Sequence, residues 1–70
     1  MPISARNQIP ARVRAIRRGE AMATIELDAG GQTLVASITA ESVDELGISD
    51  GSEVVAVIKA TDVMIGIAPV

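Results

Sequence analysis

The feature that most constrains the fold of this chain is a run of apolar residues, Val54-Val55-Ala56-Val57-Ile58. Consecutive β-branched residues favour a strand that is apolar on both faces, whereas a strand with one solvated face alternates apolar and polar residues. A domain of 70 residues has a single inner face for this strand to cover. We therefore expect the second apolar face to contact another subunit, so that the protein oligomerises through the faces of its strands.

The core of so short a chain is small. A domain of this size buries only about 60% of the surface of its unfolded chain, and this sequence has no Phe, Tyr or Trp to fill the interior. Small domains compensate with disulfides, a structural metal or oligomerisation. The chain has no Cys and no His, which excludes a disulfide, argues against a zinc site and again favours oligomerisation.

The same two absences limit the chemistry. Without Cys there is no thiolate nucleophile, and without His no side chain has an ordinary pKa near neutrality. The sequence contains no P-loop, dinucleotide fingerprint, catalytic triad or cluster of metal ligands. We expect a protein that is not an enzyme, has no cofactor and coordinates no metal directly.

Charge is unevenly distributed along the chain. Residues 1–18 contain five arginines and no acid, whereas the remainder contains one lysine and nine acids. An arginine-rich start is typical of a nucleic-acid-binding arm, but arginines at alternate positions of a strand also cover a solvated face. We favour the solvated face, because no aromatic residue is available to stack on a base. No apolar run resembles a signal peptide or a membrane span, so we expect a cytoplasmic protein without nucleic-acid or membrane partners.

Apolar residues at alternate positions predict short strands. The expected strands are residues 11–18, 22–27, 32–38, 53–58 and 64–67, with a turn at Gly19-Glu20 and a hairpin at Gly30-Gly31. The residues expected to face inward in the first three strands are Ala11, Val13, Ala15, Ala23, Ile25, Leu27, Leu34, Ala36 and Ile38.

A short helix is expected between the third and fourth strands, over residues 40–46. Thr39 is a typical N-cap, Ile38 and Val43 have the spacing of a hydrophobic staple, and Gly47 suits a left-handed C-cap. Five short strands with a helix in this place predict an all-β fold with one short helix, arranged as a five-stranded barrel of the oligonucleotide/oligosaccharide-binding (OB) type.

Several remaining polar residues are suited to binding an oxyanion, because they donate hydrogen bonds or carry positive charge. Each also has a simpler interpretation: the first residues of a chain are often frayed, a helix cap occupies a hydroxyl, and a lysine beside apolar surface can extend its head into water. These candidates are Ser4, Arg6, Asn7, Ser37, Thr39 and Lys59.

Three segments resemble the molbindins, the small cytoplasmic molybdate-binding Mop proteins. They are Ile3-Ser4-Ala5-Arg6-Asn7-Gln8, then residues 38–42 with 46–48, and residues 57–65, which include Ile58-Lys59-Ala60. The resemblance covers nearly the whole chain, so residues 1–70 are expected to form a single Mop (TOBE-like) domain. It implies an OB-like barrel, a homohexamer built as a trimer of dimers, and molybdate or tungstate bound between subunits. Intracellular storage and homeostasis of the oxyanion is the function it implies.

The resemblance also implies which residues bind. In molbindins the oxyanion contacts the Ser-Ala-Arg-Asn segment near the N-terminus of one subunit and the Ile-Lys-Ala segment of a neighbouring subunit. It also contacts the threonine that precedes the helix. The matching positions are Ser4, Ala5, Arg6, Asn7, Thr39, Lys59 and Ala60. For a second class of site near the threefold axis, the candidates are Gly19, Glu20, Ala21, Met22 and Ser42. The chain departs from many relatives at Pro10 and in its arginine-rich first strand.

Two interpretations from other classes stay open at this point. One is an OB-type module that binds nucleic acid through the arginine-rich strand. The other is an assembly module that recognises a protein partner through the apolar run at residues 54–58.

Overall fold

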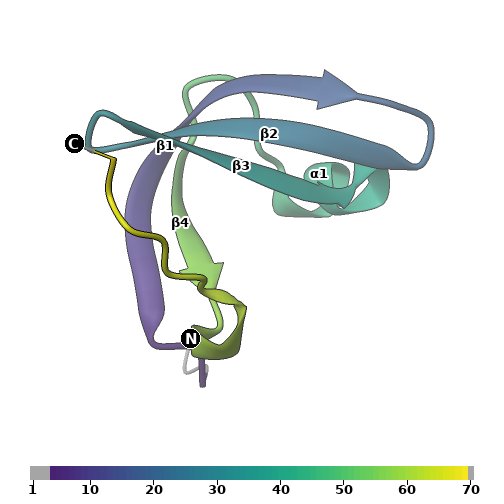
Figure 1. The fold of residues 1–70 in the computed structure, drawn as a ribbon. Coiled ribbons are helices and arrows are strands. Elements are labelled where there is room, and N and C mark those ends of the chain that lie inside the picture. Colours follow the sequence, from purple (N-terminus) through teal and green to yellow (C-terminus); the bar gives the residue numbers. More distant parts are fainter. Residues whose placement is uncertain (1–3, 70) are drawn as a thin grey trace.

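The fold is a four-stranded antiparallel sheet with one short helix (Figure 1). The computed structural model describes residues 4–69, so Ile3 of the molbindin-like segment lies outside the described residues. The strands lie in the order β3-β2-β1-β4. The elements are β1 (Asn7–Arg18), β2 (Met22–Ala29), β3 (Gln32–Thr39), α1 (Ala40–Leu46), β4 (Glu53–Ile58) and the 3-10 turn η1 (Ala60–Asp62).

The strand β1 is long and bent, and it joins the two halves of the sheet (Figure 1). Its first half pairs with β4, from Asn7 opposite Ile58 to Arg12 opposite Glu53, and its second half pairs with β2. This strand begins earlier than the sequence predicts and includes Pro10. Residues 7–11 pair with β4 on one edge, and their other edge has no partner strand. A proline is tolerated there, because the unpaired edge needs no N–H for a hydrogen bond to another strand.

An irregularity in β1 corrects one sequence expectation. The register between β1 and β2 shifts between Val13 and Ala15, which is the signature of a β-bulge. The extra residue reverses the alternation of side chains beyond it, so Ile16, opposite Ile25, packs against the core where Ala15 was expected to do so.

Local chemistry accounts for the hairpin and the helix. Gly30 and Gly31 form the two-residue connection of β2 and β3 with φ of 62° and 89°, values that favour glycine. At the start of α1, Thr39 Oγ1 accepts a hydrogen bond from Ser42 N at 3.0 Å. At its end, Gly47 adopts φ 65° and donates to the carbonyls of Val43 and Asp44. The predicted hairpin, N-cap and C-cap are confirmed.

The buried core is small and lies between one face of the sheet and α1. Partly buried residues of β3 and β4 surround it, including the predicted inward-facing Leu34, Ala36 and Ile38. The buried residues are Val13, Ala23, Ile25, Leu27, Ala40 and Val43. The predicted inward face of β2 is therefore confirmed.

The predicted fifth strand and closed barrel are wrong for the single chain. Within residues 4–69 the sheet has four strands and is open, and residues 63–69 belong to no strand. Strand propensity describes which residues fit a pleated surface, but it does not supply the edge with which they pair. The radius of gyration is 13.1 Å, whereas about 11 Å is expected for a compact domain of this length. None of the helices in this part of the chain is long and apolar enough to cross a membrane.

Candidate functional site

The candidate site is a small cavity where the segment before β1 meets the segment after β4. Antiparallel pairing of Asn7 with Ile58 brings these two segments side by side. The cavity has a volume of about 170 Å³, and its lining residues are Ser4, Ala5, Arg6, Lys59, Ala60 and Thr61. Five of these residues were predicted from the sequence as oxyanion ligands.

Side-chain amides hold the first segment in place. Asn7 Nδ2 donates to the carbonyl of Ile58 at 3.1 Å, and Gln8 Nε2 donates to the carbonyl of Ala5 at 3.1 Å. Asn7, expected to contact a ligand, therefore also fixes the segment that carries Ser4 and Arg6 against the end of β4.

The turn η1 shapes the second segment. Asp62 N donates to the carbonyl of Lys59 at 2.9 Å, which closes the first bond of the turn. The N–H groups of Ala60 and Thr61 precede that bond, so neither has an acceptor within the turn. These N–H groups are therefore able to donate to a ligand, together with the hydroxyls of Ser4 and Thr61.

The cavity is positively charged. Two of its six lining residues, Arg6 and Lys59, are cations and none is an acid. Converging N–H and O–H donors with two positive charges are suited to a small oxyanion. Thr61 was missed by sequence reasoning, although its hydroxyl follows directly on the predicted Lys59 and Ala60.

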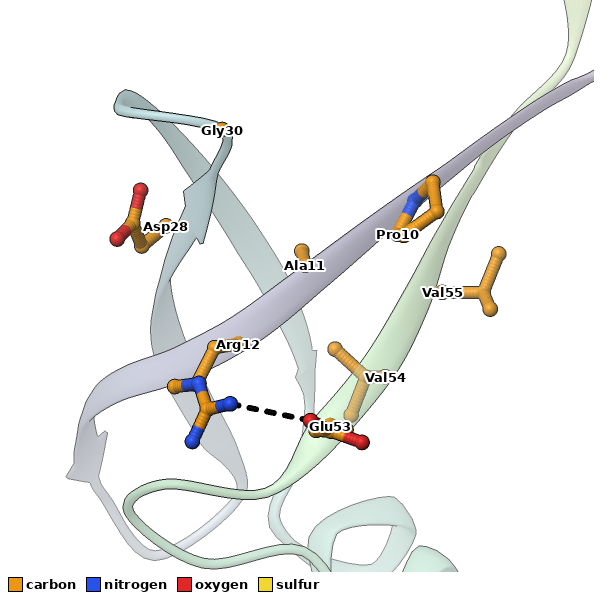
Figure 2. A pocket seen from close by; sticks show the side chains of 8 residues that line it. All are labelled: Pro10, Ala11, Arg12, Asp28, Gly30, Glu53, Val54 and Val55. Carbon is orange, nitrogen blue, oxygen red and sulfur yellow. Dashed lines mark hydrogen bonds and ion pairs between the residues drawn. The ribbon is translucent and has the colours of Figure 1, made fainter.

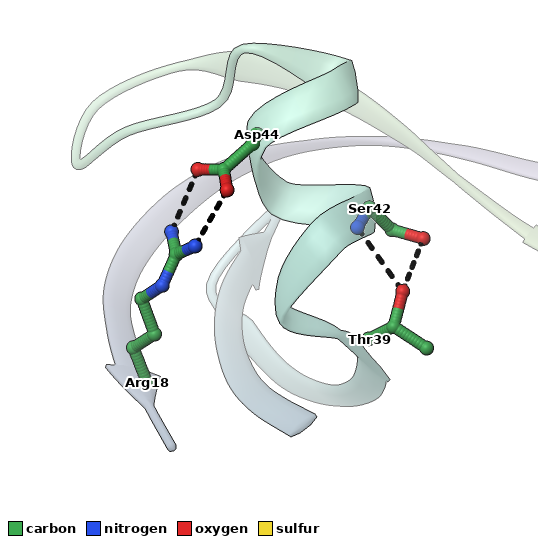
Figure 3. Close-up of polar contacts among 4 residues, drawn as sticks. All are labelled: Arg18, Thr39, Ser42 and Asp44. Carbon is green, nitrogen blue, oxygen red and sulfur yellow. Dashed lines mark hydrogen bonds and ion pairs between the residues drawn. The ribbon is translucent and has the colours of Figure 1, made fainter. Parts of the chain in front are cut away.

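Thr39 lies at the other end of the sheet. Thr39 pairs with Met22, the first residue of β2, and this end of β2 pairs with the last residues of β1. The cavity instead adjoins the first residues of β1. Its hydroxyl accepts from Ser42 N and lies 2.7 Å from Ser42 Oγ (Figure 3). One chain therefore brings residues 4–6 and 59–60 together but does not bring Thr39 to them.

The candidates for a second site gather around Thr39. Gly19 N donates to the carbonyl of Met22 at 2.8 Å, which closes the predicted turn. Ala40 N donates to the carbonyl of Ala21 at 2.9 Å, which holds this turn against the first residue of α1. Gly19, Glu20, Ala21, Met22 and Ser42 thus lie near one another and far from the cavity along β1.

An ion pair fixes α1 at this end of the molecule. Two nitrogens of Arg18 donate to the two carboxylate oxygens of Asp44, at 2.8 and 2.6 Å (Figure 3). These hydrogen bonds hold the pKa of the Asp44 carboxyl below its usual value and raise the pKa of Arg18. The charge of Arg18 is therefore compensated within the chain.

Two other arginines of β1, Arg12 and Arg14, also lie beside acids. Arg12 pairs with Glu53 at 3.0 Å, and Arg14 contacts Asp28 at 3.8 Å and donates to Thr33. A larger hollow of about 740 Å³ beside β1 contains Arg12, Glu53 and Asp28 (Figure 2), and these acids outnumber its one cation. This surface is poorly suited to nucleic acid or an oxyanion, which supports the interpretation of the arginines as a solvated face.

Residues 4–69 include no group of three or more acids positioned to hold a metal ion. The donors of the cavity are N–H groups, hydroxyls and cations, which suit an anion rather than a cation.

Known proteins with similar sequences and folds identify the family. Residues 3–65 match the TOBE domain. Molybdenum-pterin-binding protein 1 of Clostridium pasteurianum is 47% identical over 66 residues, which cover 93% of this chain and 97% of that protein. The structure of a molybdate-binding protein from Sporomusa ovata has a TM-score of 0.90 and 43% identity, and it covers 93% of this chain and 97% of that chain.

A third relative is larger. A structure of the cytoplasmic molybdate-binding protein ModG with molybdate bound has a TM-score of 0.81 and 43% identity, and it covers 86% of this chain and 43% of that chain. The Clostridium and Sporomusa relatives are described as binding proteins, which confirms the prediction that this chain is not an enzyme. Because the domain match spans most of the chain and these two relatives align over nearly their full length, the chain belongs to the TOBE-domain family, among the molybdenum-pterin-binding (Mop) proteins.

Proposed function

We propose that this protein binds molybdate, or tungstate, as an intact oxyanion at the cavity of residues 4–6 and 59–61. The observation that carries this proposal is the meeting of Arg6 and Lys59 in one cavity without an acid. The ModG structure with molybdate bound and the molybdate-binding protein of Sporomusa ovata support the choice of ligand.

The chemistry of the ligand fits the donors. Molybdate is a tetrahedral dianion at neutral pH, so two cations neutralise it. Hydroxyls of Ser4 and Thr61 and the backbone N–H groups of Ala60 and Thr61 orient its oxygens. The chain has no Cys or His, so binding proceeds through hydrogen bonds and charge rather than through bonds from the protein to the metal.

Thr39 takes part only if a second copy brings it to the cavity, because the two lie at opposite ends of β1. We infer an assembly in which the site lies between subunits, and the family resemblance favours a homohexamer built as a trimer of dimers. In that assembly residues 1–70 form one Mop-type domain, and Gly19, Glu20, Ala21, Met22 and Ser42 contribute to a second class of site.

The biological role that follows is storage and homeostasis of the oxyanion in the cytoplasm. One relative is described as cytoplasmic. A site built from exposed hydrogen-bond donors, with only two cations, releases its ligand when the free concentration falls, which suits a buffer better than a permanent trap.

Equilibrium dialysis against molybdate, with elemental analysis of the protein compartment, tests this function. The parent should retain molybdenum, and Arg6→Ala should bind roughly tenfold to a hundredfold more weakly, because a charge-assisted hydrogen bond contributes about 1.5–3 kcal/mol. Arg17→Ala is the matched control, since it removes the same charge from an exposed position outside the cavity. No retained molybdenum in the parent refutes the function, and equal losses in the two variants refute the site.

A further inference from the structure

Side-chain amides are bonded to two backbone carbonyls beside the cavity of residues 4–6 and 59–61. Gln8 Nε2 donates to the carbonyl of Ala5 at 3.1 Å, and Ala5 lines the cavity. Asn7 Nδ2 donates to the carbonyl of Ile58 at 3.1 Å, directly before the lining residue Lys59. A ligand O–H that needed an acceptor would have to share a carbonyl that already accepts a hydrogen bond.

The turn η1 uses two further carbonyls. The carbonyl of Lys59 accepts from Asp62 N at 2.9 Å, and the carbonyl of Ala60 accepts from Val63 N at 3.3 Å. The N–H groups of Ala60 and Thr61, in contrast, have no acceptor within the turn. The turn therefore presents N–H donors to the cavity while its own bonds use these two carbonyls.

The side chains that line the cavity add donors and no strong acceptor. Arg6 and Lys59 can only donate, and none of the six lining residues is an acid. The hydroxyls of Ser4 and Thr61 can accept as well as donate. A ligand O–H that donated to one of them would replace a charge-assisted hydrogen bond with a neutral one, which is about half as strong.

We propose that this cavity selects oxyanions that carry no proton, and that Gln8 is a positioning residue for this selectivity. The inference rests on the proposed function, because it concerns the same cavity. In mildly alkaline solution molybdate, tungstate and selenate are fully deprotonated dianions, whereas arsenate and phosphate are dianions that retain one proton. Net charge does not distinguish the two groups. The retained proton does, because a buried O–H without an acceptor costs free energy.

Gln8 acts through the carbonyl of Ala5, since Gln8 itself does not line the cavity. Its side chain is exposed on β1, so its replacement leaves the buried core intact. Gln8→Met keeps an unbranched side chain of similar length but removes the amide. The lone pair of the Ala5 carbonyl that Gln8 uses then becomes available to a ligand O–H.

Competition between selenate and arsenate tests the proposal. These two tetrahedral dianions are similar in size, and one proton is the main difference between them. In equilibrium dialysis of the parent with molybdate in mildly alkaline buffer, selenate should displace molybdate roughly tenfold or more effectively than arsenate does. In Gln8→Met, arsenate should compete roughly twofold to tenfold better than in the parent, and selenate should not gain. A merely structural role of Gln8 would change the two competitors equally.

Gln32→Met is the matched control, because Gln32 is exposed at the start of β3 and does not line the cavity. It should leave the ratio of selenate to arsenate competition as it is in the parent. Arsenate that competes with the parent as well as selenate does, or selenate that displaces no molybdate, would overturn the selectivity. A ratio in Gln8→Met equal to that of the parent would overturn the role of Gln8. A parent that retains no molybdate refutes instead the proposed function on which the selectivity rests.

Discussion

Lys59 is the residue at which the competing interpretations of the sequence differ most. A lysine beside an apolar strand can extend its head into water, or it can anchor an anion. Lys59 follows β4 directly, is exposed in the single chain and lines the cavity with Arg6. The arrangement favours the anchor, because Arg6 and the hydroxyls of Ser4 and Thr61 line the same cavity and no acid does.

We expect Lys59→Met to weaken molybdate binding by roughly one to two orders of magnitude, because it removes a charge-assisted hydrogen bond of about 1.5–3 kcal/mol. The ligand-free protein should keep its Tm, since an exposed ammonium contributes little to folding. Ligand stabilises a protein in proportion to its occupancy of the folded state, so molybdate should raise the Tm of the parent much more than that of the variant. Thermal scans with and without molybdate measure the difference.

The control for Lys59→Met is Arg17→Met, which removes a positive charge from an exposed position of β1 outside the cavity. It should leave the molybdate-induced shift in Tm unchanged. If parent and Lys59→Met show equal shifts, Lys59 does not anchor the ligand and only extends its head into water.

Thr39 shows how one hydroxyl can serve a helix cap and a ligand. Its oxygen accepts from Ser42 N at 3.0 Å and lies 2.7 Å from Ser42 Oγ. If Ser42 donates in the second contact, the Thr39 O–H remains available as a donor. The cap therefore does not exclude the role that the family resemblance implies for Thr39.

At the scale of elements, the Arg18–Asp44 pair fastens α1 to the end of β1 and makes this attachment dependent on pH. Hydrogen bonding to Arg18 lowers the pKa of Asp44 in the folded state. The unfolded chain therefore binds this proton more tightly, so the contribution to stability is present above the ordinary carboxyl pKa of about 3.9. It is lost as the pH falls through the lowered folded-state value. The raised pKa of Arg18 has its effect only in strong alkali.

Asp44→Asn should consequently lower the Tm at pH 7, and the difference from the parent should shrink as the pH falls below about 3.9. Thermal unfolding between pH 7 and pH 3 measures this. The control is Glu45→Gln, because Glu45 is also exposed on α1. This substitution removes the same negative charge but leaves the Arg18–Asp44 ion pair intact. A difference between parent and Asp44→Asn that is constant with pH would show that the pair does not titrate as its geometry indicates.

The elements that sequence reasoning predicted correctly are those specified by local chemistry. Gly30 and Gly31 require the hairpin, and Thr39 and Gly47 define the ends of α1. The bulge in β1 could not be predicted, because the sequence around Arg14 contains no glycine to mark it and the shift arises from pairing with β2. The strand predicted at residues 64–67 is absent from the single chain, because an apolar pattern indicates which residues suit a strand but not which edge they pair with.

The sequence predicted the candidate site only in part. Residues 4–6 and 59–60 meet because antiparallel strands place the start of one beside the end of the other. The sequence pattern by itself did not indicate that Thr39 lies at the opposite end of β1. That separation depends on the strand order β3-β2-β1-β4, which brings Thr39 beside Met22.

At the scale of the whole molecule, the single chain leaves many large apolar side chains exposed. Val55 and Val57 on the outer face of β4 are about half exposed, as the doubly apolar run predicts. Among the described residues the core contains only six buried side chains, none of them larger than leucine or isoleucine. A chain with this much exposed apolar surface gains more from association than from any rearrangement of its own side chains.

We therefore expect the protein to be an obligate oligomer whose stability depends on its concentration. Folding and assembly are then one equilibrium, and a tenfold dilution removes about 0.7 kcal/mol per chain from a dimer and about 1.1 kcal/mol per chain from a hexamer. For a domain of this size that corresponds to a fall in Tm of about 3–8 °C for each tenfold dilution. Thermal unfolding of ligand-free protein across a hundredfold range of concentration measures the slope, and added molybdate should raise every Tm in the series if the ligand binds the assembled state. A Tm that does not change with concentration, together with a folded monomer in sedimentation at micromolar concentration, would show that one chain is stable alone and would remove the basis for a site shared between subunits.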